Sequence, residues 1–228
     1  MQLTLPTVLI VLACLSALLE WLAIYKGWRK LEYFAKPGVM VFLFALLLVR
    51  GGIRSPLPWF GLGILLSLAG DVLLLLSNQR RGFILGLGAF LLAHCAYILG
   101  FNSPTPAFSS MTFGVAVMVL FIAMPPARRI LLAIRRKGLK PLVEPVRLYA
   151  VVISLMLFSA LLTLFRTDWL SNPAYLVSFG AVSFVTSDLL LAWNKFVRPV
   201  RRGRLLLMIT YHIGQLALVA GVIGQYGQ

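Results

Sequence analysis

Eight long apolar segments, separated by short polar connections, constrain this chain more than any other feature of its sequence. A helix needs about 20 mostly apolar residues to cross a bilayer at about 1.5 Å per residue. Cutting the sequence at clusters of charge, Pro and Gly predicts spans at 4–25, 34–50, 57–77, 83–101, 107–124, 146–165, 173–194 and 204–224. We therefore predict an all-α fold, a polytopic membrane bundle of eight transmembrane helices in a single integral membrane domain, 1–228.

The composition excludes a soluble domain, and the excess of basic residues is explained by an arrangement across a membrane. Hydrophobic residues make up 61% of the chain and charged residues 12%, a balance that no soluble surface of this size carries. The excess of 21 Lys and Arg over 6 Asp and Glu would suggest a nucleic-acid partner in a soluble protein. Here the basic residues fall in short connections between spans, so we expect no nucleic acid and a multi-pass protein of a bacterial inner membrane. The partners expected are membrane lipids, anionic at the basic loops.

The basic residues are distributed unevenly between the connections. Of the 21 Lys and Arg residues, 18 follow the first, third, fifth and seventh predicted spans, and 3 follow the second, fourth and sixth. Loops rich in Lys and Arg stay on the cytoplasmic side of a membrane. The pattern therefore predicts cytoplasmic odd-numbered loops and both termini on the non-cytoplasmic side.

One arrangement of residues occurs twice. The third span and its loop read "GDVLLLLSNQRRGF", with Asp71, and His94 follows in the fourth span. The seventh span and its loop read "SDLLLAWNKFVRPVRRGR", with Asp188, and His212 follows in the eighth. The spacing from Asp to His is 23 residues in the first copy and 24 in the second. Because the copies lie four spans apart, they predict a parallel 4+4 repeat with halves 1–104 and 105–228.

The two aspartates are the strongest candidate functional residues. Asp71 lies nine residues before Arg80 and Asp188 seven before Lys195, about 10–14 Å into the membrane at helical rise. An ionisable residue inside a membrane faces the bundle interior and is a candidate functional site. Two neighbouring carboxylates do not ionise together easily, so such a pair supplies an acid and a base at once.

Further polar residues near the same depth are candidate supporting residues. Gly86, Phe90, His94 and Tyr97 share one predicted face of the fourth span, and Tyr211 and Gln215 share a face of the eighth. The other supporting candidates are Glu20, which is close enough to the interface to reach water, and Lys36, Asn78, Asn194 and His212. Cys14 and Cys95 fall in apolar segments, which predicts packing residues and no disulfide.

The chain resembles the YhhN/TMEM86 family, whose characterised members are lysoplasmalogenases. The matching segments are "KPG" at Lys36, "GDVLLL" at Asp71, "FILGLGAFLLAHCAYILGF" across the fourth span, "SDLLLAWNKF" at Asp188 and "TYHIGQ" in the eighth. The resemblance implies an eight-helix hydrolase that cleaves the vinyl ether of a lysophospholipid substrate, with Asp71 and Asp188 as its catalytic residues. It implies no cofactor and no metal.

Two functional alternatives and one structural alternative stay open at this stage. A parallel repeat with intramembrane carboxylates also suits a proton-coupled transporter of small solutes or lipids. A metal hydrolase would use the two aspartates with His94 and His212, although these histidines lack a tight ligand spacing. Structurally, the aspartates would pair with Lys36, His94 or a loop arginine and only hold helices together.

Overall fold

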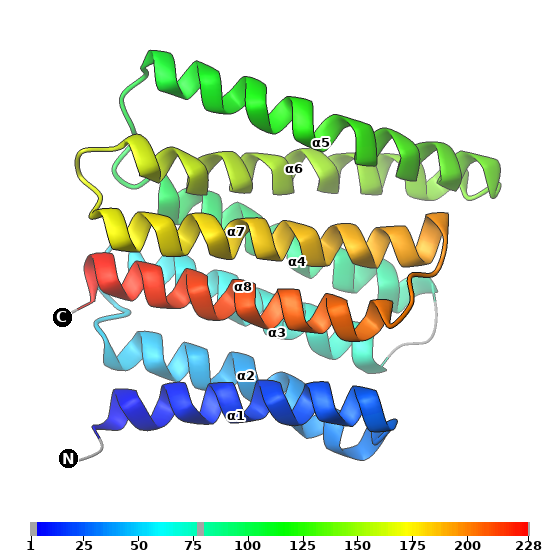
Figure 1. The fold of residues 1–228 in the computed structure, drawn as a ribbon, viewed down its shortest axis with the longest axis horizontal. Helices are drawn as coiled ribbons and strands as arrows, with labels where there is room; N and C mark the ends of the chain where they lie inside the picture. Colours follow the sequence, from blue (N-terminus) through cyan, green and yellow to red (C-terminus); the bar gives the residue numbers. More distant parts are fainter. Residues whose placement is uncertain (1–3, 77–79, 228) are drawn as a thin grey trace. The chain divides into compact units, whose positions relative to one another are not determined.

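The computed structural model describes residues 4–76 and 80–227, which form eight α-helices joined by short connections (Figure 1). Their bounds are α1 Leu5–Lys26, α2 Arg29–Val49, α3 Leu57–Leu76, α4 Arg80–Phe101, α5 Ser110–Arg136, α6 Val143–Leu162, α7 Ser171–Ala192 and α8 Gly203–Tyr226. Three short helical segments lie in the connections: η1 Lys140–Leu142 before α6, η2 Thr163–Phe165 after α6 and the π-helical η3 Trp193–Val197 after α7. All eight α-helices of the described residues are long and apolar enough to span a membrane, which confirms the all-α, eight-span prediction.

Two helix boundaries differ from the sequence prediction by five residues or more. Helix α2 begins at Arg29 rather than at 34, so Lys36 lies well inside the helix and not at its start. Helix α5 continues to Arg136 rather than ending at 124, because Pro125 and Pro126 are accommodated inside it. The basic residues assigned to the fifth loop therefore lie partly on the last turns of α5, which extend beyond an apolar span of about 20 residues.

The chain forms two compact units, and the first comprises residues 1–103 and 219–228. Within it α1 packs on α2, α2 on α3 and α3 on α4, each pair antiparallel (Figure 1). Glycine allows the close approach of α3 to α4. A Cβ on Gly70 would lie 2.6 Å from the ring of Phe90, and a Cβ on Gly63 would overlap the ring of Tyr97. These rings fill the space that the missing side chains leave.

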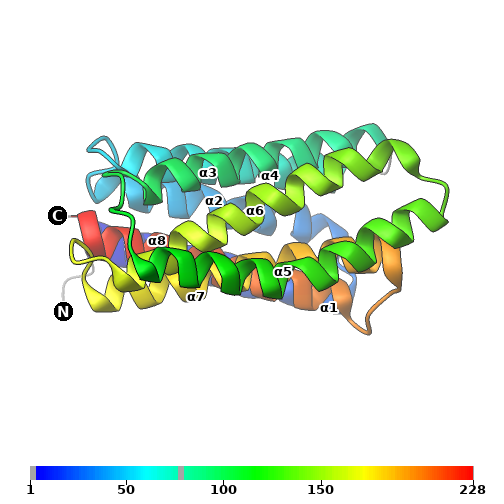
Figure 2. The same ribbon diagram turned by 90° about the horizontal axis from the view of Figure 1, so that it is seen from above.

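The second unit comprises residues 104–218 and holds α5, α6, α7 and the first part of α8, Gly203–Leu218. Helix α6 packs on both α5 and α7, and it crosses α5 at an angle (Figure 2). Helices α7 and α8 approach through glycines, because a Cβ on Gly180 would lie 2.8 Å from the carbonyl oxygen of Gly214. A capping box between Ser109 and Thr112 begins α5 by satisfying backbone N–H groups of its first turn.

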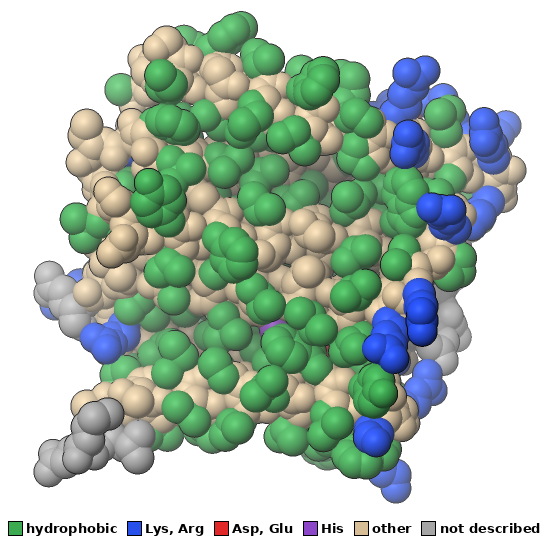
Figure 3. All heavy atoms as spheres, in the orientation of Figure 1, with side chains coloured by type: hydrophobic (Ala, Val, Ile, Leu, Met, Phe, Trp, Pro, Cys, Tyr) green, Lys and Arg blue, Asp and Glu red, His purple; other side chains and the backbone are tan. Residues whose placement is uncertain are grey.

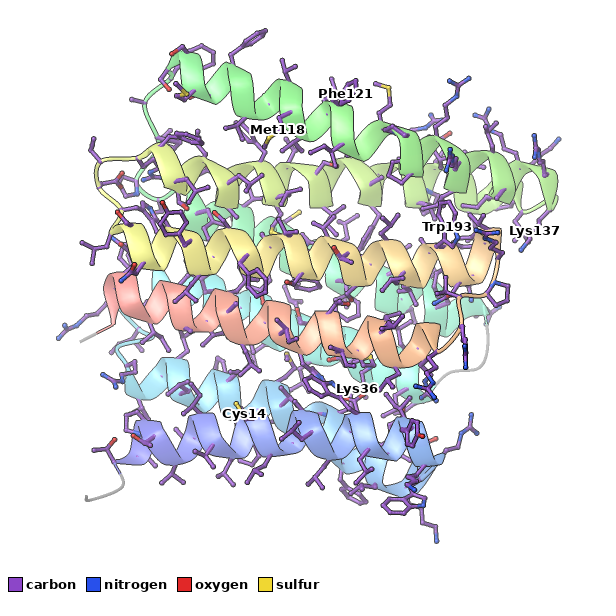
Figure 4. All side chains as sticks on the ribbon, in the orientation of Figure 1. Cys14, Lys36, Met118, Phe121, Lys137 and Trp193 are labelled. Atoms are coloured by element: carbon purple, nitrogen blue, oxygen red, sulfur yellow. The ribbon has the colours of Figure 1, made fainter. Side chains whose placement is uncertain are left out.

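The surface of each unit has the pattern of a membrane protein. Hydrophobic side chains cover the flanks of the helices, and in the second unit most Lys and Arg side chains gather at the end where α5 meets α6 and α7 meets α8 (Figure 3). Cys14 is exposed on α1 (Figure 4), so its prediction as a packing residue is wrong. Both described cysteines, Cys14 and Cys95, are free thiols.

Candidate functional site

The first candidate site is a buried ion pair between α2 and α3. The Nζ atom of Lys36 lies 3.1 Å from the Oδ1 atom of Asp71, and the two side chains are 9% and 2% exposed. Figure 4 labels Lys36 within α2. The expected pairing of Asp71 with Lys36 is confirmed. The pair satisfies two charges that would each be costly alone in an apolar interior.

Two further acidic side chains of the first unit, Glu32 and Glu20, are also buried. Glu32 is 4% exposed and precedes Lys36 by one helical turn on the same face of α2. Glu20 of α1 is fully buried, so the expectation that its side chain reaches water is wrong. Ser16 of α1 lies against Gly38 of α2. Because the two helices are antiparallel, this contact places Glu20 near Lys36 along the direction of the helix axes. Glu32 was not among the residues predicted from the sequence, because the predicted spans leave it in a loop.

Helix α4 presents the predicted stripe of Gly86, Phe90, His94 and Tyr97 to the interior, and all four residues are buried. The rings of Phe90 and Tyr97 occupy the glycine positions of α3, so these two residues hold the helices together. These two contacts between the antiparallel helices α3 and α4 place His94, which is fully buried, near Ser67 along the direction of the helix axes. Ser67 is itself buried one turn before Asp71 on α3, and it was not among the residues predicted from the sequence.

The second candidate site lies in the second unit, where the hydroxyl of Tyr149 on α6 donates a hydrogen bond to the Oδ2 atom of Asp188 on α7. Tyr149 is buried and Asp188 is half-buried. Tyr149 was not among the residues predicted from the sequence. The available signal was a tyrosine inside an apolar span, because a buried phenol hydroxyl requires a hydrogen-bond partner.

Asp188 and Tyr149 both line a cavity of about 380 Å³ between α5, α6 and α7. This volume falls within the range of about 300–1,000 Å³ that is typical of small-molecule sites. The other lining residues are mostly aliphatic, and Met118 reaches the cavity from the side of α5 that faces α6 (Figure 4). Ser154 and Thr186 also line it, but their hydroxyls donate to carbonyls of their own helices. The arrangement is a carboxylate and a phenol at the wall of an otherwise apolar chamber, named here the Asp188 cavity.

The model of the YhhN family matches residues 31–222 of this chain, which include both candidate sites. This chain belongs to the YhhN family. Its match includes Lys36, Asp71, Tyr149 and Asp188 and begins after Glu20.

Several curated relatives of this YhhN chain are named lysoplasmalogenases. The Mycobacterium tuberculosis "Lysoplasmalogenase" is 28% identical over 181 residues, which cover 78% of this chain and 66% of the relative. The human "Lysoplasmalogenase TMEM86B" is 28% identical over 158 residues, covering 69% of this chain and 60% of the relative. The mouse "Lysoplasmalogenase TMEM86B" is 27% identical over 219 residues, covering 95% and 86%. The chain thus spans less than two thirds of the first two relatives. No solved structure matches it significantly.

In this YhhN chain the candidates on α8 are buried. Tyr211 is 2% exposed, and His212 and Gln215 are fully buried. The ring of Tyr211 packs edge-on against Phe184 of α7 at a centroid distance of 5.3 Å, and it also contacts the ring of His212 at 5.3 Å. Tyr211 therefore packs α8 against α7, near the glycine contact of the same helices.

Of the two candidate asparagines, Asn194 and Asn78, only Asn194 lies among the described residues. Asn194 accepts a hydrogen bond from the backbone N–H of Val200 at 2.8 Å and lies against Gly203, so it organises the turn between η3 and α8. Asn78 lies outside the described residues. Within the described parts of the chain, no three His, Cys, Asp or Glu side chains lie close enough to hold a metal ion.

Asp71 belongs to the first unit of the YhhN chain and Asp188 to the second. The structure pairs Asp71 with the ammonium of Lys36 and Asp188 with the phenol of Tyr149. The action of both aspartates on one substrate, and the 4+4 repeat that suggested it, stay predictions.

Proposed function

We propose that this chain hydrolyses the vinyl-ether bond of lysoplasmalogens to a fatty aldehyde and glycerophosphoethanolamine or glycerophosphocholine. The observation that carries the proposal is Asp188, with its Tyr149 partner, at the wall of an apolar cavity. The family membership and the names of the relatives support the same activity. An apolar chamber suits the alkenyl chain, and a carboxyl group at its wall suits the acid-sensitive bond.

The reaction has three steps that a pair of carboxyl groups can perform. A carboxylic acid first delivers a proton to the carbon of the vinyl ether that is further from oxygen, which leaves an oxocarbenium ion. A carboxylate stabilises this cation and removes a proton from the attacking water. The resulting hemiacetal collapses to the aldehyde and the free glycerol hydroxyl, so one water is consumed. Paired carboxylates act on glycosidic bonds through a related cation.

In this proposal Asp188 is the acid and Asp71 is the carboxylate partner. Asp188 receives the acid role because it lines the cavity that fits the alkenyl chain. Tyr149 positions its carboxyl group. Lys36 orients the Asp71 carboxylate through the 3.1 Å ion pair. His94 and Gln215, both fully buried, are proposed to support the two carboxyl groups.

We also propose the membrane arrangement that the charge pattern suggests. The termini face away from the cytoplasm, the Lys- and Arg-rich connections face it, and the chain contains a parallel 4+4 repeat in a bacterial inner membrane. The uneven distribution of basic residues supports the orientation. The recurrence of an Asp followed by a His at nearly equal spacing supports the repeat.

The test uses purified protein and matched lysolipids that differ only in a vinyl-ether, alkyl-ether or ester linkage. We expect aldehyde release from the vinyl ether alone, lost in Asp188→Asn and in Asp71→Asn and retained in the exposed control Asp168→Asn. Full activity of a double Asp71→Asn/Asp188→Asn variant would refute the assignment. Proton-driven uptake into reconstituted vesicles without lipid hydrolysis would favour the transporter instead.

A further inference from the structure

A second hollow of about 830 Å³ runs between α5 and α6, and we name it the α5–α6 groove. Its lining residues recur at helical spacing on both helices, from Ala116 to Arg135 on α5 and from Arg147 to Phe158 on α6. The lining is apolar except for Ser154 and three arginines, which are Arg128, Arg135 and Arg147. The groove therefore combines a long apolar trough with a cationic end.

The dimensions of this groove match one lipid chain in one leaflet. From Ala116 to Arg128 the helix rises about 18 Å, slightly more than half of a hydrocarbon core that is about 30 Å thick. All three arginines lie toward the connected ends of α5 and α6. A hydrocarbon chain in the apolar part would place its phosphate among guanidinium groups, which bind phosphate oxygens in bidentate geometry.

A carboxylate accompanies the arginines. Glu144 accepts a hydrogen bond from Arg147 at 2.9 Å, and the two side chains are 72% and 47% exposed. Exposed pairs of this kind contribute little stability, so Arg147 stays available to a ligand. Neighbouring positive and negative groups complement a zwitterionic head group, with phosphate at the arginines and ammonium at Glu144.

The groove and the Asp188 cavity share part of their walls. Six residues line both, and four of them have small side chains: Val119, Ala123, Ala127, Leu131, Ala150 and Ser154. Pro125 and Pro126 lie in the same stretch of α5 and provide no backbone N–H, so α5 lacks two helical hydrogen bonds there. The shared wall therefore consists mostly of small side chains and lies where α5 is easiest to deform.

We propose that the α5–α6 groove is the docking site of a zwitterionic lysophospholipid, which passes between α5 and α6 into the Asp188 cavity. The inference rests on the proposed function for its substrate. It adds the place where the substrate leaves the bilayer, the residues that hold its phosphate and the wall that it crosses.

The kinetic test compares two charge-matched variants of α5. Arg128→Gln/Arg135→Gln removes two arginines from the groove, whereas Arg129→Gln/Arg136→Gln removes two exposed arginines that do not line it. We expect the groove variant to raise KM for lysoplasmalogen about tenfold or more, because the phosphate loses two guanidinium partners, with kcat within about twofold. A tenfold loss of affinity corresponds to about 1.4 kcal/mol of binding free energy. The control variant should match the wild type. Equal KM values for both variants would overturn the proposal.

A binding test keeps the docking site separate from the chemistry. An alkyl-ether lysolipid with a photoreactive chain cannot be hydrolysed at a vinyl ether, and it should label α5 and α6 in the Asp188→Asn protein. Labelling should fall in the Arg128→Gln/Arg135→Gln background. If the wild-type protein is labelled in the same way but hydrolyses no lysoplasmalogen, the docking site is supported and the proposed function is refuted. Equal labelling by a two-chain phospholipid probe, or exclusion of the probe by a second copy of the chain, would overturn the docking site.

The shared wall has its own test. Ala127→Phe should narrow the passage, lowering kcat/KM about tenfold while photolabelling of the groove persists. Persistent labelling shows that the variant is folded. Wild-type kcat/KM in a variant that is labelled normally would overturn passage between α5 and α6.

Discussion

The ammonium nitrogen of Lys36 lies 3.1 Å from the Oδ1 atom of Asp71, and the two side chains are only 9% and 2% exposed. Each charge needs the other, because removing one partner of a buried ion pair leaves an uncompensated charge. The pair joins α2 to α3 in the first unit. It therefore offers a way to separate a structural role of Asp71 from a catalytic one.

Lys36→Met is expected to lower the free energy of unfolding by about 3–5 kcal/mol, because Asp71 stays buried without its counter-charge. Lys30→Met, an exposed lysine on the same helix, is the control and should change stability little. Unfolding in detergent micelles measures both. The double variant Lys36→Met/Asp71→Asn should recover much of the lost stability. If it also recovers aldehyde release, Asp71 is a structural residue.

Tyr149→Phe tests the partner of Asp188. Loss of a hydrogen bond to a carboxyl group is expected to cost about 1.5–3 kcal/mol of stability. If Tyr149 positions Asp188, kcat should fall and its pH profile should shift while KM changes little. Tyr175→Phe, an exposed tyrosine of the same unit, is the control. An unaltered kcat and pH profile in Tyr149→Phe would contradict a positioning role.

The contrast between Asp71 and Asp188 shows what the sequence can predict. Their depth in the membrane stays a prediction from the distance to the next basic residue, whereas apolar flanks indicated that both face the interior. The partner Tyr149 lies 39 residues from Asp188, and the rotation of α6 against α7 that brings them together is set by side-chain packing. The pattern of apolar residues within one helix does not predict how that helix is rotated against its neighbour.

The helix boundaries that differed also have physical causes. A Lys-Pro pair resembles the end of a loop, but Pro37 removes only one helical hydrogen bond, and Asp71 compensates the charge of Lys36. Charge and proline likewise suggested an end for α5 at 124, whereas the helix continues past Pro126. Charges that pair in three dimensions, or that stand beyond the hydrocarbon layer, do not end a helix.

Gly180→Ala tests the close contact of α7 with α8. The added Cβ would lie 2.8 Å from the carbonyl oxygen of Gly214 and from the backbone nitrogen of Leu218, so the two helices must separate. Overpacking of this kind costs about 1–3 kcal/mol. Gly114→Ala is the matched control, because a Cβ there meets nothing within 4 Å and alanine favours the helix. Thermal unfolding should show the first variant destabilised and the second unchanged or stabilised.

The connection between α6 and α7 provides a pH-dependent prediction outside the membrane spans. Arg166 donates from Nε and Nη2 to the carboxylate of Asp168 at 2.9 and 2.6 Å, and its Nη2 also donates to the carbonyl of Pro104 at 3.0 Å. The hydrogen bonds from Arg166 lower the pKa of Asp168 below its ordinary value. A lowered pKa in the folded state stabilises the protein above the unfolded pKa of about 3.9 and loses that effect as the pH falls through the folded pKa.

Asp168→Asn is therefore expected to lower Tm slightly at pH 7, and its difference from the wild type should shrink below about pH 4. The effect should stay small, because the Asp168 side chain is 45% exposed and water screens the pair. Thermal unfolding from pH 3 to pH 8 measures it. In an Arg166→Gln background the Asp168 substitution should have almost no pH-dependent effect. A Tm difference that is constant across this range would show that the ion pair does not couple to folding.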